Sequence, residues 1–327
     1  MRSEFGTAYE LAEDFIATAE KRGDDNDLLI AYRIMGSCLT FLGRWEESIQ
    51  YLEKSLSLYD IERHKSLAVT YAQDPRIAAL TLYSWSLLHN GRYDDALRAA
   101  KMAIDEAHAF GHLHTTAYAL GLAGTMFYQF CGMLKRTREC ADTLVEMCTK
   151  QPVPLWNNLG FCLQGWAIGM QGDPASGIRQ LEKGYDGFSG TGATMFMDYY
   201  CTLKAELYIE DDKPDHAIEC LEQAQAAQKK KEVDWFAAGF HRACGDLYCK
   251  MGMDEKAVSA YNAGLEIATT RNDLLNQLRC SMGIVELNRD TAQAINGLVV
   301  LKTIYQRFPQ GHESPDLIRA AGILNSN

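Results

Sequence analysis

The chain has 327 residues, more than one globular core usually organises, so its length favours two domains or an array of repeats. Hydrophobic residues make up 47% and charged residues 23% of the chain, which excludes an intrinsically disordered protein. The formal net charge of −11 argues against nucleic acid or an anionic membrane surface as a partner.

Ten cysteines are scattered along the chain without any C-x-x-C pair, and most of them fall inside helical patterns. This distribution favours reduced thiols in a hydrophobic core over a disulfide framework. The first residues lack the apolar stretch of a signal peptide, and no segment has the apolar length that spans a bilayer. We therefore predict a cytoplasmic protein with no membrane partner.

Residues 1–22 are predicted to form a single helix that has no partner helix before it. Phe5 and Leu11 occupy the places that Trp45 and Tyr51 hold one repeat later, which is the pattern of a second helix alone. A helix left in this way would expose an apolar face that a repeat array normally covers. We therefore expect the natural protein to continue upstream of this chain, and the isolated chain to self-associate through this helix.

Short turns recur along the chain, each between two helical apolar patterns. The turn position falls at Ser3, Gly43, Gly91, Gly132, Gly172, Asp212, Gly252 and about Asp290. Most of these positions are about 40 residues apart, and such regular spacing is typical of stacked helical hairpins. The spacing predicts an all-α fold: one right-handed α-solenoid over residues 1–327, built from about seven tetratricopeptide-like hairpins with long helices.

The sixth unit shows the tetratricopeptide pattern most clearly. Gly245 and Tyr248 stand in its first helix, Gly252 stands at the turn, and Ala257 and Tyr261 stand in its second helix. Small residues allow the two helices of a hairpin to approach closely, while large apolar residues fill the space between hairpins.

One repeat is about eight residues longer than the others, which places an insertion at residues 59–75. Insertions in solenoids gather on one face and often contact ligands, so His64, Gln73 and Asp74 are candidate binding residues. The alternative is a lengthened loop in which Asp74 and Pro75 begin the next helix.

First helices of such hairpins line the concave face of the solenoid, and this rule predicts a groove. The residues that it places there are Arg33, Trp85, His89, Met126, Gln129, Trp166, Tyr199, Glu206, Arg242 and Asp246. Aromatic rings interspersed with arginine and carboxylate groups are the composition of a binding surface. The alternative is a tightly curved solenoid in which Trp85 and Trp166 belong to the core.

Catalytic and metal-binding patterns are weak in this chain. His112 and His114 flank a turn without a nearby cysteine or carboxylate cluster, which favours ordinary turn residues over a metal site. The acidic run at 24–27 lacks the glycine and the terminal glutamate of a calcium loop. No G-x-x-x-x-G-K-[ST] segment is present to hold phosphates. We predict no catalytic residues, no metal and no cofactor.

Residues 311–327 are predicted to form a C-terminal capping helix.

Several segments of the chain are similar in sequence to segments of one group of proteins. These segments are SLYDIERHKSLAVTYAQDP, LYSWSLLHNGRYDDAL, PLWNNLGFCLQGWAIGMQGD and FPQGHESPDLIRAAGIL. Over nearly its whole length the chain resembles the C-terminal tetratricopeptide region of bacterial proteins that join a class III adenylate/guanylate cyclase domain to an AAA-type ATPase.

The resemblance implies that cyclase and ATPase chemistry lie upstream and that the repeats serve as a sensing or docking arm. We therefore predict a non-catalytic interaction and regulatory module that binds a protein or peptide segment, such as another domain of its parent signalling protein, in its concave groove. The alternative is a small-molecule sensor that controls the upstream cyclase or ATPase.

Overall fold

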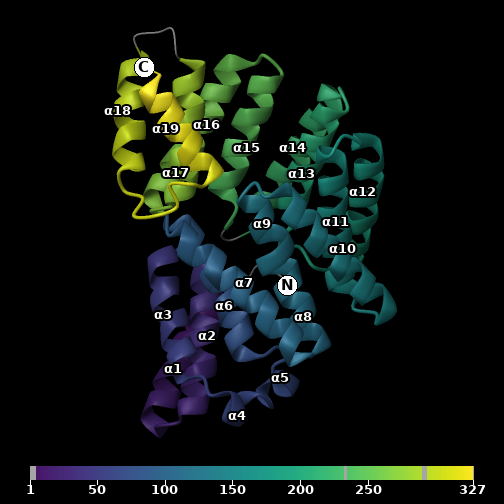
Figure 1. Cartoon of the computed structure of the whole chain (residues 1–327), viewed down its shortest axis with the longest axis vertical. Coiled ribbons are helices and arrows are strands. Elements are labelled where there is room, and N and C mark those ends of the chain that lie inside the picture. Colours follow the sequence, from purple (N-terminus) through teal and green to yellow (C-terminus); the bar gives the residue numbers. More distant parts are fainter. Residues whose placement is uncertain (1–4, 232–233, 289–292, 327) are drawn as a thin grey trace.

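The computed structural model describes residues 5–231, 234–288 and 293–326, and these residues contain helices and no strand. Helix α1 (Phe5–Arg22) comes first and α19 (Pro315–Asn325) comes last. Between them, helices pair into antiparallel hairpins (Figure 1). The pairs are α2 (Asp25–Leu42) with α3 (Trp45–Leu58), α6 (Pro75–His89) with α7 (Tyr93–Phe110), α11 (Pro154–Met170) with α12 (Pro174–Gly190), α13 (Met197–Glu210) with α14 (Pro214–Gln228), α15 (Ala237–Lys250) with α16 (Asp254–Thr270), and α17 (Leu274–Leu287) with α18 (Gln293–Tyr305).

The remaining hairpin, third along the chain, has an irregular first helix. It consists of α8 (Leu113–Ala119), a π-helical stretch η1 (Leu120–Met126) and α9 (Phe127–Phe130), and it packs on α10 (Leu134–Lys150). The predicted all-α solenoid of about seven long-helix hairpins is confirmed, because the described residues form seven such pairs with helices of up to 18 residues.

The predicted turn positions within the described residues share a positive φ angle, while Ser3 and about Asp290 lie outside the described residues. Gly43, Gly91, Gly132, Gly172 and Gly252 all have positive φ angles, which is the usual way for a helix to end at a glycine. Asp212 holds the equivalent place with a φ of 55°, a conformation that a short polar side chain tolerates better than a branched one.

Helix α1 lies within the predicted range 1–22 and packs against α2. Ala12 and Ala19 are buried in that contact, and the ring of Phe5 stacks on Phe41 with centroids 4.8 Å apart. Leu11 is 64% exposed, so α1 buries one face and leaves a large apolar side chain in solvent.

The insertion 59–75 folds into two single-turn helices, α4 (Ile61–His64) and α5 (Leu67–Thr70), before α6 begins at Pro75. His64 is buried, with Nε2 2.8 Å from Asn26 Oδ1. Asp74 is also buried and caps α6: it accepts hydrogen bonds from the Ile77 amide at 3.0 Å and from the Tyr59 hydroxyl at 2.6 Å. The polar atoms of His64 and Asp74 are thus used inside the fold, and Asp74 with Pro75 begins α6, as the alternative of a lengthened loop expects. Gln73 is half-buried beside them.

The solenoid curves so tightly that its C-terminal hairpins contact its N-terminal hairpins (Figure 1). His89 Nδ1 lies 2.9 Å from Asp273 Oδ1, which joins α6 to the start of α17. The Gln310 side chain exchanges two hydrogen bonds of 2.9 Å with Asp95, one with its amide and one with its carboxylate. We call these contacts, of His89 with Asp273 and of Asp95 with Gln310, the closure.

Trp235, in the segment between α14 and α15, lies at the centre of the aromatic core. Its ring packs 5.3 Å from Trp85, 6.0 Å from Phe130 and 6.5 Å from Phe41, measured between centroids. Trp85 is completely buried, and its indole Nε1 donates to the Leu122 carbonyl at 3.0 Å. Packing of Trp235 against the rings of Phe41, Trp85 and Phe130 thus converts part of the concave face into core.

Candidate binding cavity

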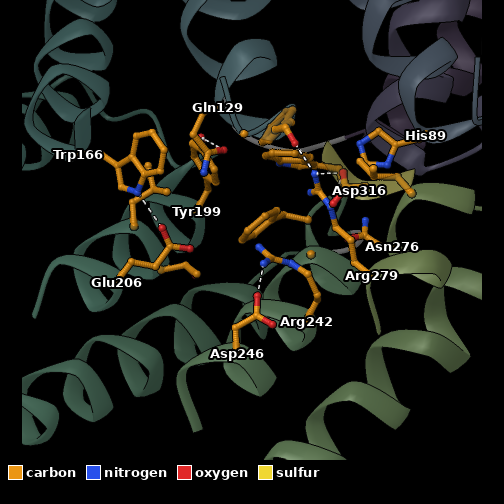
Figure 2. Close-up of a pocket in the computed structure, with 18 of the residues that line it drawn as sticks. His89, Gln129, Trp166, Tyr199, Glu206, Arg242, Asp246, Asn276, Arg279 and Asp316 are labelled. Atoms are coloured by element: carbon orange, nitrogen blue, oxygen red, sulfur yellow. Dashed lines mark hydrogen bonds and ion pairs between the residues drawn. The ribbon is translucent and has the colours of Figure 1, made fainter. Parts of the chain in front are cut away.

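The curvature of the solenoid leaves a cavity of about 260 Å³ at its centre. First helices from six hairpins supply its walls, together with α19 and the segment before α15 (Figure 2). The lining residues are His89, Gln129, Phe130, Gly132, Trp166, Tyr199, Thr202, Leu203, Glu206, Trp235, Phe236, Gly239, Arg242, Asp246, Leu275, Asn276, Arg279, Asp316 and Arg319. Seven of the ten residues predicted to line the groove belong to this set.

The other three predicted groove residues lie elsewhere. Trp85 and Met126 are both completely buried in the core, so neither presents a surface to a ligand. Arg33 is half-buried on α2 and does not line the cavity. Placing Trp85 and Met126 in the groove is therefore wrong, because both are packed into the core, Trp85 against the rings of Phe41, Phe130 and Trp235. Arg33 belongs to the first hairpin, which supplies no residue to the cavity lining.

Trp166 and Glu206 form one side of the cavity (Figure 2). The indole Nε1 of Trp166 donates a hydrogen bond of 2.7 Å to Glu206 Oε2. Tyr199 lies beside them, and its hydroxyl donates to Gln129 Oε1 at 2.9 Å. These bonds hold the rings of Trp166 and Tyr199 in one orientation on this wall.

Arg242 and Asp246 lie one turn apart on α15 and form an ion pair at the floor of the cavity. The Tyr261 hydroxyl also donates to Asp246, at 2.7 Å. Burial disfavours the guanidinium cation, but the charges of Asp246 and Glu206 outweigh this cost and raise the pKa of Arg242. Its Nε is buried without a hydrogen-bond partner among the described residues.

Arg279 and Asp316 occupy the opposite side, and sequence reasoning missed both. Arg279 donates to the two carboxylate oxygens of Asp316 at 2.7–3.1 Å and to the Phe130 carbonyl at 2.6 Å. The bidentate pair joins α17 to α19 and to the third hairpin. The only sequence signal was the distinctive GHESPDL segment, which contains Asp316.

His89 lies at the edge of the cavity where the closure begins. Its ring stacks on Trp45 with centroids 4.1 Å apart, and its Nδ1 faces Asp273. Its Nε2 is buried and has no hydrogen-bond partner among the described residues. Burial opposes ionisation of Asp273, but the charge of His89 and hydrogen bonds from His89 and Asn276 hold the pKa of this carboxyl below its usual range.

A buried charged cluster supports the cavity wall from behind. The Lys231 ammonium contacts the carboxylates of Asp198 and Asp234, and all three side chains are at least nine-tenths buried. Burial and the charge of Asp234 raise the pKa of Asp198. Asp234 Oδ1 also accepts a hydrogen bond from the Phe236 amide at 3.1 Å, which anchors the segment that carries Trp235 and Phe236.

The cavity thus combines guanidinium groups, carboxylates and aromatic rings, a set of groups suited to binding a polar ligand.

Among the described residues, no three His, Cys, Asp or Glu side chains form a group that could hold a metal ion. No helix in the described ranges combines the length and the apolar character needed to cross a bilayer.

Comparison with known proteins finds tetratricopeptide repeats at residues 31–66 and 199–231, in the first and fifth hairpins. An uncharacterised protein of Rhizobium meliloti strain 1021, R02095, is 23% identical over 253 residues. The match covers 77% of this chain and 23% of that relative, so the chain spans about a quarter of the relative's length.

Solved structures confirm the tetratricopeptide-like fold. The apo form of RapI superposes with a TM-score of 0.59 at 13% identity, covering 81% of this chain and 90% of that one. The Rap conjugation gene regulator of plasmid pLS20, solved with the Phr* peptide, superposes with a TM-score of 0.61 at 10% identity, covering 88% and 76%. Cut9, from the APC/C Cut9–Hcn1 hetero-tetramer, gives 0.59 at 17% identity, covering 99% and 53%.

Proposed function

We propose that this chain is a non-catalytic regulatory module that binds a short peptide segment in its central cavity. The observation that carries the proposal is the convergence of three arginines and three carboxylates, with fixed aromatic side chains, from successive hairpins onto one cavity. A peptide offers amide groups, charged side chains and apolar side chains together, and this mixed lining complements all three.

The cavity volume sets the size of the ligand. About 260 Å³ admits a few side chains or one end of a peptide, but not a folded domain. A partner protein would therefore insert a terminus or a loop. A structural neighbour that was solved with the Phr* peptide bound supports a peptide as the occupant. That segment could belong to another domain of the parent protein, in which an upstream cyclase or ATPase would receive the signal.

A small-molecule sensor remains the second candidate, because the cavity is compact rather than a long open groove. Trp166 is only 7% exposed and Trp85 is not exposed, so no extended aromatic strip is available to a long peptide. A ligand that bound the closed form more tightly than an opened form would stabilise the closure and so transmit a signal.

A selection experiment tests the peptide proposal. The full chain is incubated with a random library of short peptides, and retained peptides are identified by mass spectrometry. Gln129→Trp, which fills the cavity from α9, is expected to weaken binding of the retained peptides by at least about tenfold. Gln223→Trp, an exposed position on α14, serves as the matched control and is expected to bind as the wild type does.

Failure to retain any peptide, or equal binding by both variants, would contradict the peptide proposal. Stabilisation of the wild type by a metabolite mixture, measured as a rise in Tm that Gln129→Trp abolishes, would instead support the small-molecule candidate.

We further propose that the chain is cytoplasmic, because its eight buried free cysteines suit a reducing compartment.

We also propose that the chain self-associates through α1. Leu11 supports self-association, because this large apolar side chain of α1 is 64% exposed. Leu11→Glu is expected to shift the chain toward monomer in sedimentation velocity at high concentration. Glu10→Gln, an exposed neighbour, is the control. A wild-type chain that stays monomeric would contradict the proposal.

A further inference from the structure

Three carboxylates line the cavity, and one of them lacks a cation. Asp246 pairs with Arg242, and Asp316 pairs with Arg279. In the part of the chain that the structure describes, Glu206 accepts a hydrogen bond from the Trp166 indole and forms no ion pair. Its other carboxylate oxygen is therefore the acidic group in the cavity that is available to a ligand.

The surroundings of Glu206 do not compensate its charge fully. Burial raises the pKa of Glu206, and the nearby charge of Asp246 adds to that effect. Arg242 and Lys250 favour the ionised form, as does the hydrogen bond from Trp166, but they do not restore the ordinary pKa. A half-buried carboxylate whose charge is incompletely compensated gains from any cation that reaches it.

Glu206 also lines a second hollow. This hollow of about 450 Å³ shares Glu206, Asp246 and Arg319 with the cavity. Its two basic lining groups already have acidic partners, since Arg319 pairs with Glu286 and Lys250 pairs with Glu210. Among the described residues, this hollow therefore adds no unpaired positive charge beside Glu206, and the net charge of −11 attracts cations over a longer range.

We propose that Glu206 is the counter-ion for a cationic group of the ligand, such as an arginine or lysine side chain or the amino terminus of a peptide. This inference rests on the proposed function, because it assigns a chemical class to the occupant of the same cavity. The Trp166 indole holds the carboxylate in position through its hydrogen bond of 2.7 Å to Oε2. A guanidinium or ammonium group would form charge-assisted hydrogen bonds with the carboxylate, next to apolar walls that exclude water.

Two small probes that differ only in charge test the inference. N-acetyl-arginine methylamide carries a guanidinium, and N-acetyl-citrulline methylamide is its neutral analogue of nearly the same shape. Each is titrated into the full chain and followed by calorimetry. We expect the arginine probe to bind the wild type at least about tenfold more tightly than the citrulline probe, as a hydrogen-bonded charge pair typically requires.

Two variants locate the effect. Glu206→Gln keeps an oxygen that can accept from Trp166 while removing the charge, and it is expected to lose the preference for the arginine probe. Glu219→Gln removes an exposed charge from α14 and is expected to keep the preference. Melting curves of the three proteins confirm that each is folded before titration.

Equal affinity of the wild type for both probes, or no measurable binding of either, would overturn the inference. A preference that survives in Glu206→Gln would overturn it as well. The peptide proposal is judged separately by the library selection: retained peptides without basic groups would leave that proposal standing and contradict this one. Conversely, charge-selective probe binding without any retained peptide would support Glu206 as a cation site and contradict the peptide proposal.

Discussion

Replacing Trp85 with alanine is expected to lower the free energy of unfolding by about 3–5 kcal/mol, the usual cost of deleting a large buried aromatic side chain. Trp85 has no exposed surface, and it contacts the rings of Phe41, Phe130 and Trp235 from three separate parts of the chain. The cavity left by the truncation would lie where these parts meet, so neighbouring side chains could fill it only in part.

Urea unfolding followed by circular dichroism measures this loss. Trp85→Phe keeps a ring but loses the hydrogen bond from Nε1 to the Leu122 carbonyl, and a smaller loss of about 1–3 kcal/mol is expected. A loss below about 1 kcal/mol in Trp85→Ala would show that Trp85 is not a core residue, and would return it to the groove.

Replacing Asp273 with alanine is expected to destabilise the chain by about 3–5 kcal/mol, because the change leaves a buried histidine without its partner. Asp273 also caps α17, accepting from the Asn276 amide at 3.1 Å. Asp173 caps α12 in the same way, accepting from the Ser176 amide at 3.1 Å, but it is exposed and forms no hydrogen bond or ion pair with another hairpin among the described residues. Asp173→Ala is therefore the matched control, with an expected loss of about 1 kcal/mol.

Small-angle scattering of the same variants reports on the closure. Asp273→Ala is expected to increase the radius of gyration, whereas Asp173→Ala should leave it unchanged. Equal stability losses in the two variants would mean that Asp273 acts as a helix cap alone and that the His89 contact contributes nothing measurable.

The contribution of Asp273 to the free energy of unfolding also depends on pH in a defined direction. Its pKa in the folded chain lies below the ordinary aspartate value of about 3.9 that applies to the unfolded chain. The stabilisation is therefore fully present above that value and is lost as the pH falls through the lower folded-state pKa. Stability measured below about pH 4 should fall less steeply in Asp273→Ala than in the wild type.

The hairpin architecture could be predicted from the sequence because its signals are local. Turn residues recur at positions such as Gly43 and Gly252, and both have the left-handed conformation that their residue type favours. The side of each first helix that faces inward also follows from the repeat, which explains why Trp166, Glu206 and Arg242 were identified as facing the concave side.

The closure could not be predicted, because it depends on the accumulated rotation of all seven hairpins. His89 and Asp273 are 184 residues apart, and no local pattern connects them. Trp85 and Trp166 hold the same place in their repeats, yet Trp85 faces Trp235 in the core while Trp166 reaches the cavity. Arg279 was missed for the same reason, since its partners come from α19 and the third hairpin.

The π-helical stretch at Leu120–Met126 explains an irregularity in the spacing of the turns. Forty-one residues separate Gly91 from Gly132, whereas forty separate Gly132 from Gly172 and Gly172 from Asp212. A π-helical turn accommodates one residue more than an α-helical turn does, so the third hairpin absorbs a single-residue insertion within its first helix instead of lengthening a loop. The outer dimensions of the hairpin are thereby kept, and every later repeat stacks in the same register. The side chains that follow the π-helical stretch, on α9, are rotated about the helix axis.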